Sequence, residues 1–232
     1  MSGLRAALEL AEEYTITVVT KSEIKASNTN WAQGGIAVVK NEGDTVESHV
    51  SDTLDAGDGL CDVSEVRKLV EEGPRQVDQL IEWGAQFDKE NGELSYTREG
   101  GHHHDRVIHG RGDATGELVE EVLVKQVRLH PRITVLENTF MVDLLTDERR
   151  VYGALLYRDE QLEVTWSRGV VLGTGGLGQV FRETTNHPVV TGDGMATAFR
   201  AGVCLRDMEF IQFHPTTLYV AGGPRFLISE AV

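Results

Sequence analysis

The fold is decided by Ser2-Gly3-Leu4-Arg5-Ala6-Ala7-Leu8 and by the run Thr15-Ile16-Thr17-Val18-Val19-Thr20 that soon follows it. Leu4, Leu8 and Ala11 recur on one helical face, which predicts a helix that begins directly after Gly3. The β-branched run is short and apolar, as is typical of a buried strand. The chain is therefore expected to open with a helix followed by a strand.

A glycine directly before a helix has a specific meaning in proteins that bind dinucleotides. Their βαβ unit carries a G-x-G-x-x-G turn whose third glycine opens the helix. Ser2-Gly3 matches the end of such a turn, so we expect the first strand and the first two glycines to precede Met1. An ordinary glycine before an ordinary helix is the alternative. At the other end, residues 226–232 are apolar and stop without a cap or turn, which indicates a second truncation.

Helical and strand patterns alternate between these ends. Residues 44–90 have helical periodicity, with Asp44 as a first-turn cap, breaks at 57–62 and Gly73-Pro74, and a hairpin-like turn at 90–93. A His- and Gly-rich loop over 97–116 precedes a helix that ends near His130. Strands are then predicted at 133–136, 142–145, 151–157, 162–166 and 169–172. The predicted fold class is α/β with an antiparallel β insertion.

Composition narrows the class of protein. The chain has 232 residues, 40% of them hydrophobic and 25% charged, which excludes disorder over most of its length. A formal net charge of −15 repels phosphate backbones and anionic lipid, so nucleic acid and membrane are excluded as partners. No apolar run reaches the roughly 18 residues of a membrane span. The two cysteines, Cys61 and Cys204, form neither a disulfide framework nor a metal pair, which favours a reducing, cytoplasmic location.

Two glycine-rich stretches could approach a large ligand. Gly173-Thr174-Gly175-Gly176 follows an apolar run, and its missing Cβ atoms let a ligand or a neighbouring strand lie against the backbone. Thr191-Gly192-Asp193-Gly194 precedes a helical pattern and places Asp193 at the helix N-terminus. That carboxylate either caps the helix or accepts a hydrogen bond from a ribityl or ribose hydroxyl.

Histidines gather in one loop. By residue type, His102, His104, His109 and Asp105 could form a zinc site, so a non-catalytic zinc-binding module is one alternative. Such loop clusters without fixed spacing more often form hydrogen bonds or face solvent, and we therefore predict no metal site. His214 lies between an aromatic residue and a proline, a stiff setting for a hydrogen-bond donor that is usually structural.

Seven motifs then follow one another in a fixed order along the chain. They are Ser2-Gly3-Leu4-Arg5-Ala6-Ala7, residues 28–37 (NTNWAQGGIA), residues 98–102 (REGGH), residues 113–116 (DATG), residues 173–176 (GTGG), residues 191–194 (TGDG) and residues 208–216 (MEFIQFHPT). This order closely resembles the flavoprotein family of succinate dehydrogenase, fumarate reductase and L-aspartate oxidase, and most closely its aspartate-oxidising branch. The resemblance implies a Rossmann-like FAD-binding domain over residues 1–207 and the beginning of an α+β capping domain over 208–232.

The resemblance also implies how the cofactor is bound. In the membrane-bound members a flavin-linking His precedes the Gln of A-Q-G-G by five residues, and Asn28 occupies that position here, which implies non-covalent FAD. The residues that would line FAD are Ser2, Gly3, Lys21, Asn28, Thr29, Asn30, Trp31, Ala32, Gln33, Gly34, Gly35, Phe140, Met141 and Asp193.

Substrate contacts follow from the same resemblance. Glu99 and His214 would be the catalytic residues, with Glu99 recognising the substrate amino group. Gln212, His214 and Ser229 would contact the substrate carboxylates, and Arg225 would add positive charge.

The implied reaction is oxidation of L-aspartate to iminoaspartate, with oxygen or fumarate as electron acceptor. The product would feed quinolinate and NAD biosynthesis, which implies a functional link to quinolinate synthase. A soluble fumarate reductase or succinate dehydrogenase-like dicarboxylate flavoprotein is the alternative. The family's catalytic Arg follows the segment that ends here at Val232, so we expect residues 1–232 alone to bind FAD weakly and to be inactive.

Overall fold

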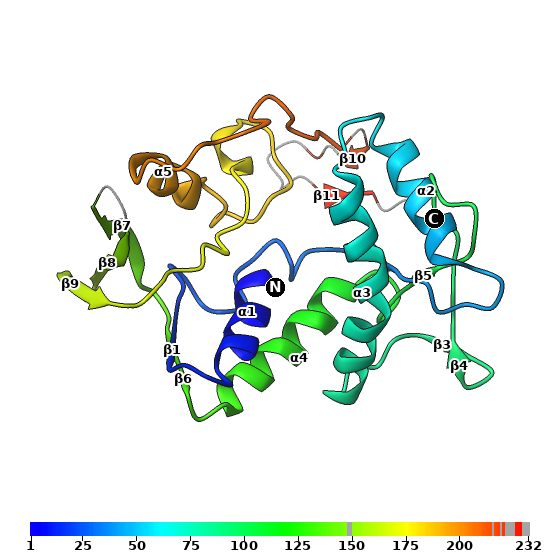
Figure 1. Cartoon of the computed structure of the whole chain (residues 1–232), viewed down its shortest axis with the longest axis horizontal. Helices are drawn as coiled ribbons and strands as arrows, with labels where there is room; N and C mark the ends of the chain where they lie inside the picture. Colours follow the sequence, from blue (N-terminus) through cyan, green and yellow to red (C-terminus); the bar gives the residue numbers. More distant parts are fainter. Residues whose placement is uncertain (148–149, 215, 219, 221–225, 229–232) are drawn as a thin grey trace. The chain divides into compact units, whose positions relative to one another are not determined.

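The computed structural model describes residues 1–147, 150–214, 216–218, 220 and 226–228 (Figure 1). The chain divides into two compact units. Unit 1 contains Met1–Thr29 and Leu123–Ile228, and unit 2 contains Asn30–Val122. The division falls within helix α4 (Thr115–Leu129), which therefore contributes residues to both units.

Unit 1 begins with a helix and a parallel strand pair. Helix α1 (Ser2–Leu10) buries Leu4, Ala7 and Leu8 and contacts strand β1 (Ile16–Val19). Strand β1 pairs in parallel with β6 (Ile133–Leu136), Ile16 being opposite Ile133. The predicted helix and both predicted strands are confirmed.

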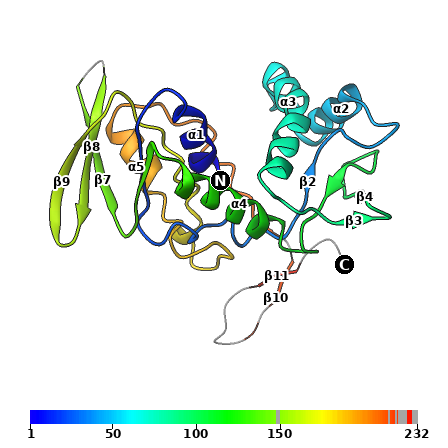
Figure 2. The ribbon, with the colours of Figure 1, turned by 90° about the horizontal axis from the view of Figure 1, so that it is seen from below.

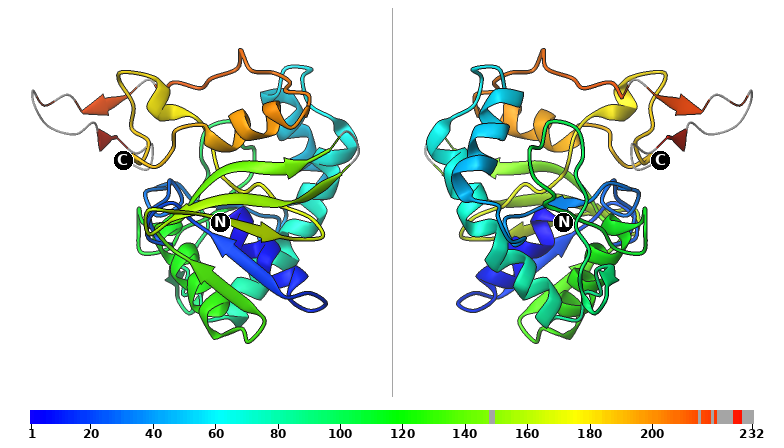
Figure 3. Two further views of the ribbon diagram at one scale, coloured as in Figure 1. Left: turned by 90° about the vertical axis from the view of Figure 1, so that its left-hand side faces the viewer. Right: turned by 90° about the vertical axis from the view of Figure 1, so that its right-hand side faces the viewer.

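A three-stranded antiparallel sheet is the second layer of unit 1. Its order is β7 (Phe140–Thr146), β8 (Val151–Arg158) and β9 (Gln161–Trp166), which confirms three further predicted strands. Helix α5 (Asp193–Arg200) lies over one face of this sheet (Figures 2 and 3). Arg200 Nε donates to Asp143 of β7 at 2.9 Å, and Leu156 and Ala198 are buried.

The strand predicted at 169–172 is wrong. No described strand pairs with this segment, and Val171 is 61% exposed. An apolar run forms a strand only where a neighbour accepts and donates its backbone hydrogen bonds. The remaining short elements of unit 1 are the 3₁₀ turn η1 (Gly178–Val180) and the antiparallel pair β10 (Thr217–Leu218) and β11 (Phe226–Leu227).

Unit 2 is built on two helices that pack against each other, α2 (Val46–Ala56) and α3 (Val63–Glu82). The predicted break at 57–62 separates them. The predicted cap is wrong by one residue, because Thr45 rather than Asp44 accepts the hydrogen bond from Ser48 N. The predicted break at Gly73-Pro74 is also wrong, since α3 continues through Pro74. Burial of Val70 and Val77 on either side outweighs the low helix propensity of proline.

Short strands complete unit 2. Strands β3 (Lys89–Glu90) and β4 (Glu93–Leu94) form the predicted hairpin, with positive φ at Asn91 and Gly92. Strand β5 (Val107–Ile108) lies inside the predicted loop and pairs antiparallel with β2 (Ile36–Ala37). Within the described part of the chain, no helix is both long and apolar enough to cross a membrane.

Candidate functional site

Glycines bring three segments of unit 1 into close contact. A Cβ at Gly173 would lie 2.8 Å from N and 2.9 Å from Cα of Gly3, so only glycine fits at this position. A Cβ at Gly194, in the first turn of α5, would overlap the side chain of Thr174. The first turn of α1 carries neither a side-chain cap nor an acidic residue, so its N–H groups suit an anion. We call the backbone of Gly3, Gly173 and the first turn of α1 the glycine cradle.

Lys21 and Asp193 form an ion pair close to that cradle. Lys21 Nζ also donates to Thr191 Oγ1, and that hydroxyl contacts both carboxylate oxygens of Asp193 at 2.8 and 2.9 Å. Burial raises the pKa of Asp193, but the hydrogen bonds from Lys21 and Thr191 and the charge of Lys21 outweigh it, leaving the pKa below its ordinary value. The site therefore presents a cation and an ionised carboxylate, which suit phosphate and hydroxyl groups respectively.

The strand that would carry Phe140 and Met141 starts beside this pair. The backbone N–H of Thr139 donates to Thr20 O at 3.0 Å, which places the beginning of β7 next to Lys21. Phe140 is 39% exposed, so its ring is available to a ligand.

Asn28 uses both ends of its amide. Its Nδ2 donates to Asn186 Oδ1 at 2.6 Å, and its Oδ1 accepts from His187 N at 2.7 Å. Thr29 Oγ1 accepts from the amino terminus of Met1 at 3.4 Å. Two hydrogen bonds of Asn28 thus connect residues 186–187 with the segment that would contact flavin.

Residues 184–186 also line a cavity of about 430 Å³. Gln212 and His214 line the same cavity, together with Phe181 and Phe213, whose rings stack edge to face at 5.1 Å. The structure therefore brings together two of the three predicted carboxylate-binding residues. Ser229 and Arg225 lie outside the described residues.

The predicted flavin loop of unit 2 spans Asn30, Trp31, Ala32, Gln33, Gly34 and Gly35. Gln33 Oε1 is buried, and no hydrogen-bond partner reaches it within the described parts of the chain. A buried amide oxygen without a partner is costly unless a ligand or water satisfies it. Gly35 leaves no room for a side chain, since a Cβ there would lie 2.7 Å from Ile108 O and 2.8 Å from His109 Nε2.

Glu99 is half-buried and pairs with a histidine. His109 Nε2 lies 3.0 Å from Glu99 Oε1, and the other ring nitrogen faces Thr97 Oγ1 at 3.5 Å. The glutamate side chain is 30% exposed, against 12% for the histidine. Glu99 therefore keeps a carboxylate face available to a cationic group.

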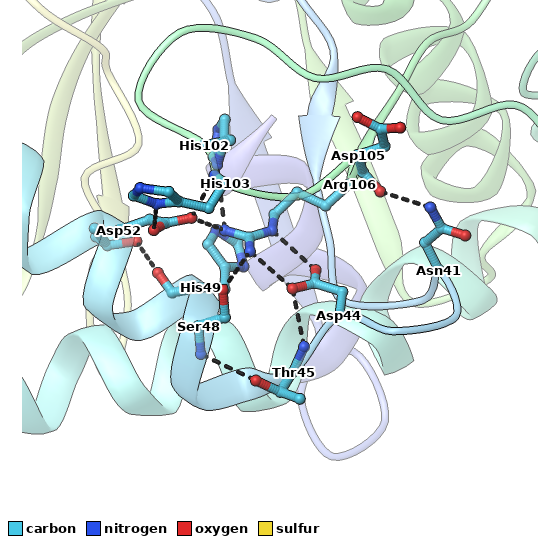
Figure 4. Close-up of polar contacts among 11 residues, drawn as sticks. Asn41, Asp44, Thr45, Ser48, His49, Asp52, His102, His103, Asp105 and Arg106 are labelled. Atoms are coloured by element: carbon cyan, nitrogen blue, oxygen red, sulfur yellow. Dashed lines mark hydrogen bonds and ion pairs between the residues drawn. The ribbon is translucent and has the colours of Figure 1, made fainter.

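A buried arginine was missed by the sequence reasoning. Arg106 is fully buried and donates to Asp44 at 2.7 and 2.9 Å, to Asp52 at 2.6 Å and to Ser48 at 3.1 Å (Figure 4). Asp44, Ser48 and Asp52 follow one another at four-residue spacing, and this repeated helical face was the signal that could have revealed a buried cation. Because Asp44, Ser48 and Asp52 accept the hydrogen bonds of its guanidinium, Arg106 stabilises the fold rather than binding a ligand. We call Arg106, Asp44, Ser48 and Asp52 the arginine cluster.

Histidines surround the arginine cluster. His103 donates its backbone N–H to Asp52 at 3.0 Å, and its Nδ1 lies 2.5 Å from the same carboxylate. Burial raises the pKa of Asp52, but hydrogen bonds from His103 and Arg106 and the arginine charge hold it well below its ordinary range. Burial, with the nearby positive charge of Arg106, lowers the pKa of His49, whose ring meets that of His102 edge to face.

The loop histidines do not converge on one point. His103 pairs with Asp52 and His109 pairs with Glu99. Across the described ranges, no three His, Cys, Asp or Glu side chains gather as metal ligands would. The zinc-binding alternative therefore finds no support in this part of the chain.

The residues present fit FAD. Within unit 1, the N–H groups in the uncapped first turn of α1 suit an anionic group such as a pyrophosphate, and the ionised Asp193 can accept from a ribityl hydroxyl. These are features of a dinucleotide site rather than of a small-anion site.

Comparison with known proteins agrees with this arrangement. Residues 1–232 match the family described as FAD binding domain. The whole chain is 49% identical to L-aspartate oxidase of Streptomyces coelicolor and 44% identical to L-aspartate oxidase 1 of Ralstonia nicotianae, covering 42% and 45% of those proteins. A variant of E. coli quinol fumarate reductase superposes over 98% of this chain and 39% of its own, with a TM-score of 0.92 and 34% identity. The chain thus spans less than half the length of each of these three proteins.

Two independent lines, the glycine cradle with its charged neighbours and a family match over every residue, now point to one cofactor. FAD is the cofactor of this family. The chain belongs to the FAD-binding domain family of the succinate dehydrogenase and fumarate reductase flavoproteins.

Proposed function

We propose that this chain is the flavin-binding part of an enzyme that oxidises L-aspartate to iminoaspartate. The observation that carries the proposal is whole-chain identity of 49% and 44% to two L-aspartate oxidases, against 34% to a fumarate reductase. The half-buried Glu99 adds chemical support, because a carboxylate is the natural partner of a substrate ammonium.

FAD would be held non-covalently in a Rossmann-like domain over residues 1–207. The parallel pair β1–β6 and the glycine cradle support that architecture, with β7–β9 as its antiparallel insertion and residues 208–232 as the beginning of an α+β capping domain. Asn28 supports non-covalent binding, because a side-chain amide is not a nucleophile that could form a bond to the flavin, and both ends of this amide form hydrogen bonds with residues 186–187. The contacts would come from Ser2, Gly3, Lys21, residues 28–35, Phe140, Met141 and Asp193.

The substrate would be oriented by opposite charges. Glu99 would accept hydrogen bonds from the ammonium, while Gln212, His214 and Ser229 would bind the carboxylates, aided by Arg225. Because the net charge of the chain is −15, a dianionic substrate needs such a local cationic pocket. When bound, FAD supplies the two-electron acceptor chemistry, with oxygen or fumarate taking the electrons afterwards.

The product places the enzyme before quinolinate formation in NAD biosynthesis, with a functional link to quinolinate synthase. A cytoplasmic location agrees with two free thiols, Cys61 and Cys204.

A soluble fumarate reductase or succinate dehydrogenase-like flavoprotein is the second candidate function. The TM-score of 0.92 with a fumarate reductase favours it. A dicarboxylate without an amine offers Glu99 no cationic partner, and this difference separates the two candidates.

The test uses the natural full-length protein with saturating FAD. We expect L-aspartate-dependent peroxide formation, and Glu99→Gln should lower kcat/KM for L-aspartate at least about tenfold while changing fumarate reduction by less than about threefold. Glu90→Gln, on the exposed hairpin, is the matched control. Absence of any L-aspartate turnover, or equal losses for both substrates, would contradict the proposal.

A further inference from the structure

His109 occupies a place between the flavin loop and Glu99. Its Nε2 lies 3.0 Å from Glu99 Oε1. A Cβ atom at Gly35 would lie 2.8 Å from the same nitrogen. We propose that His109 is a positioning residue that holds the Glu99 carboxylate in the orientation required to bind a substrate ammonium. This inference rests on the proposed function.

The hydrogen bond defines which ring nitrogen carries a proton. An ionised carboxylate only accepts, so His109 Nε2 donates to Glu99. On the other side of the ring, Nδ1 lies 3.5 Å from Thr97 Oγ1, whose single hydroxyl proton is donated to Val107 O at 3.4 Å. The hydrogen bond to Glu99 therefore anchors the ring through Nε2, and the His109 side chain is only 12% exposed.

Packing prevents the ring from turning away. Ile36 pairs with Ile108, which holds Gly35 against the residue that precedes His109. Gly35 has no side chain and contacts this backbone so closely that any other residue would displace it. The histidine therefore occupies a space bounded by the flavin loop, β5 and Glu99.

This fixed ring matters because a glutamate is flexible. Its side chain has three rotatable bonds, and a free carboxylate 30% exposed would spread over several rotamers. A donor that fixes the carboxylate before substrate arrives removes that entropy cost from binding. The benefit applies only to substrates with an amine, so His109 would contribute to selectivity between L-aspartate and amine-free dicarboxylates.

Three variants test the role of His109. His109→Leu removes the N–H that faces Glu99 but keeps a side chain of similar size. His109→Gln restores an N–H at the position of Nε2. His104→Leu is the control from the same loop. In the natural full-length protein with FAD, we expect His109→Leu to raise KM for L-aspartate about tenfold, with kcat and the KM for fumarate changed less than about twofold. His109→Gln should recover most of the loss.

A second readout needs neither flavin nor substrate. In two-bond ¹H–¹⁵N spectra of the natural full-length protein without ligand, Glu99→Gln should shift the His109 ring nitrogens and leave those of His104 unchanged. Unshifted His109 nitrogens would overturn the inference, as would equal losses for L-aspartate and fumarate in His109→Leu. If the wild-type protein does not respond to L-aspartate, the proposed function fails and the inference fails with it. If the wild-type response survives in His109→Leu, the inference alone fails.

Discussion

Replacing Arg106 by methionine tests how much the arginine cluster stabilises the folded chain. The substitution keeps most of the side-chain volume but removes the guanidinium donors to Asp44 and Asp52, whose side chains are 1% and 3% exposed. Among the described residues, Asp44 then keeps only the backbone N–H of Thr45 as a donor, and Asp52 keeps only His103. Removing one partner of a buried ion pair typically costs about 3–5 kcal/mol, because the remaining charge stays desolvated. For a chain of this size each kcal/mol lowers Tm by about 2–4 °C, so a fall of about 10 °C is expected.

Thermal and urea unfolding, followed by circular dichroism, measure this loss. Arg67→Met is the matched control, since Arg67 forms only exposed ion pairs with Glu47 and Glu71 at 3.3 and 3.5 Å. Such exposed pairs contribute about 0–1 kcal/mol. Adding Asp44→Asn and Asp52→Asn to Arg106→Met should restore part of the stability. Equal losses for Arg106→Met and Arg67→Met would refute the reasoning.

Three further predictions concern pH, packing and the Asn28 contact. Folding lowers the pKa of Asp52, so the stability that its ionised carboxylate gives the fold is complete above the ordinary pKa of about 4 and is lost as the pH falls towards the pKa of the folded state. The urea midpoint should therefore fall less between pH 6 and pH 3 in Asp52→Asn than in the wild-type protein. Gly173→Ala should weaken FAD binding in a fluorescence titration at least about tenfold, because its Cβ would push the Gly3 backbone away, whereas Gly169→Ala, in open space, should not. Asn28→Ala should lower stability by about 1 kcal/mol through its two lost hydrogen bonds and increase amide exchange at His187.

Elements fixed by local pattern were predictable from the sequence. Helix α1 and strands β1, β8 and β9 follow from apolar periodicity and β-branched runs, which are properties of each short segment itself. The predictions that failed depend on distant partners. No strand in the described part of the chain pairs with residues 169–172, and Pro74 stays in a helix that tertiary packing holds together.

The site divides in the same way. The motifs predicted which residues would meet a flavin and a dicarboxylate, but periodicity cannot pair Lys21 with Asp193, which lie 172 positions apart. The spacing of Asp44, Ser48 and Asp52 indicated a polar face, but it could not identify Arg106, which lies 62 positions after Asp44, as the cation that this face binds. Single hydrogen bonds such as His109 to Glu99 depend on side-chain rotamers, which only the folded structure defines.

The most direct test of the central claim is anaerobic reduction of the flavin by L-aspartate. The natural full-length protein is loaded with FAD, and the visible flavin absorption is followed after L-aspartate is added. The account predicts that the band bleaches with L-aspartate and, at the same concentration, does not bleach with succinate. A flavin that stays oxidised with L-aspartate but is reduced by succinate would contradict the account.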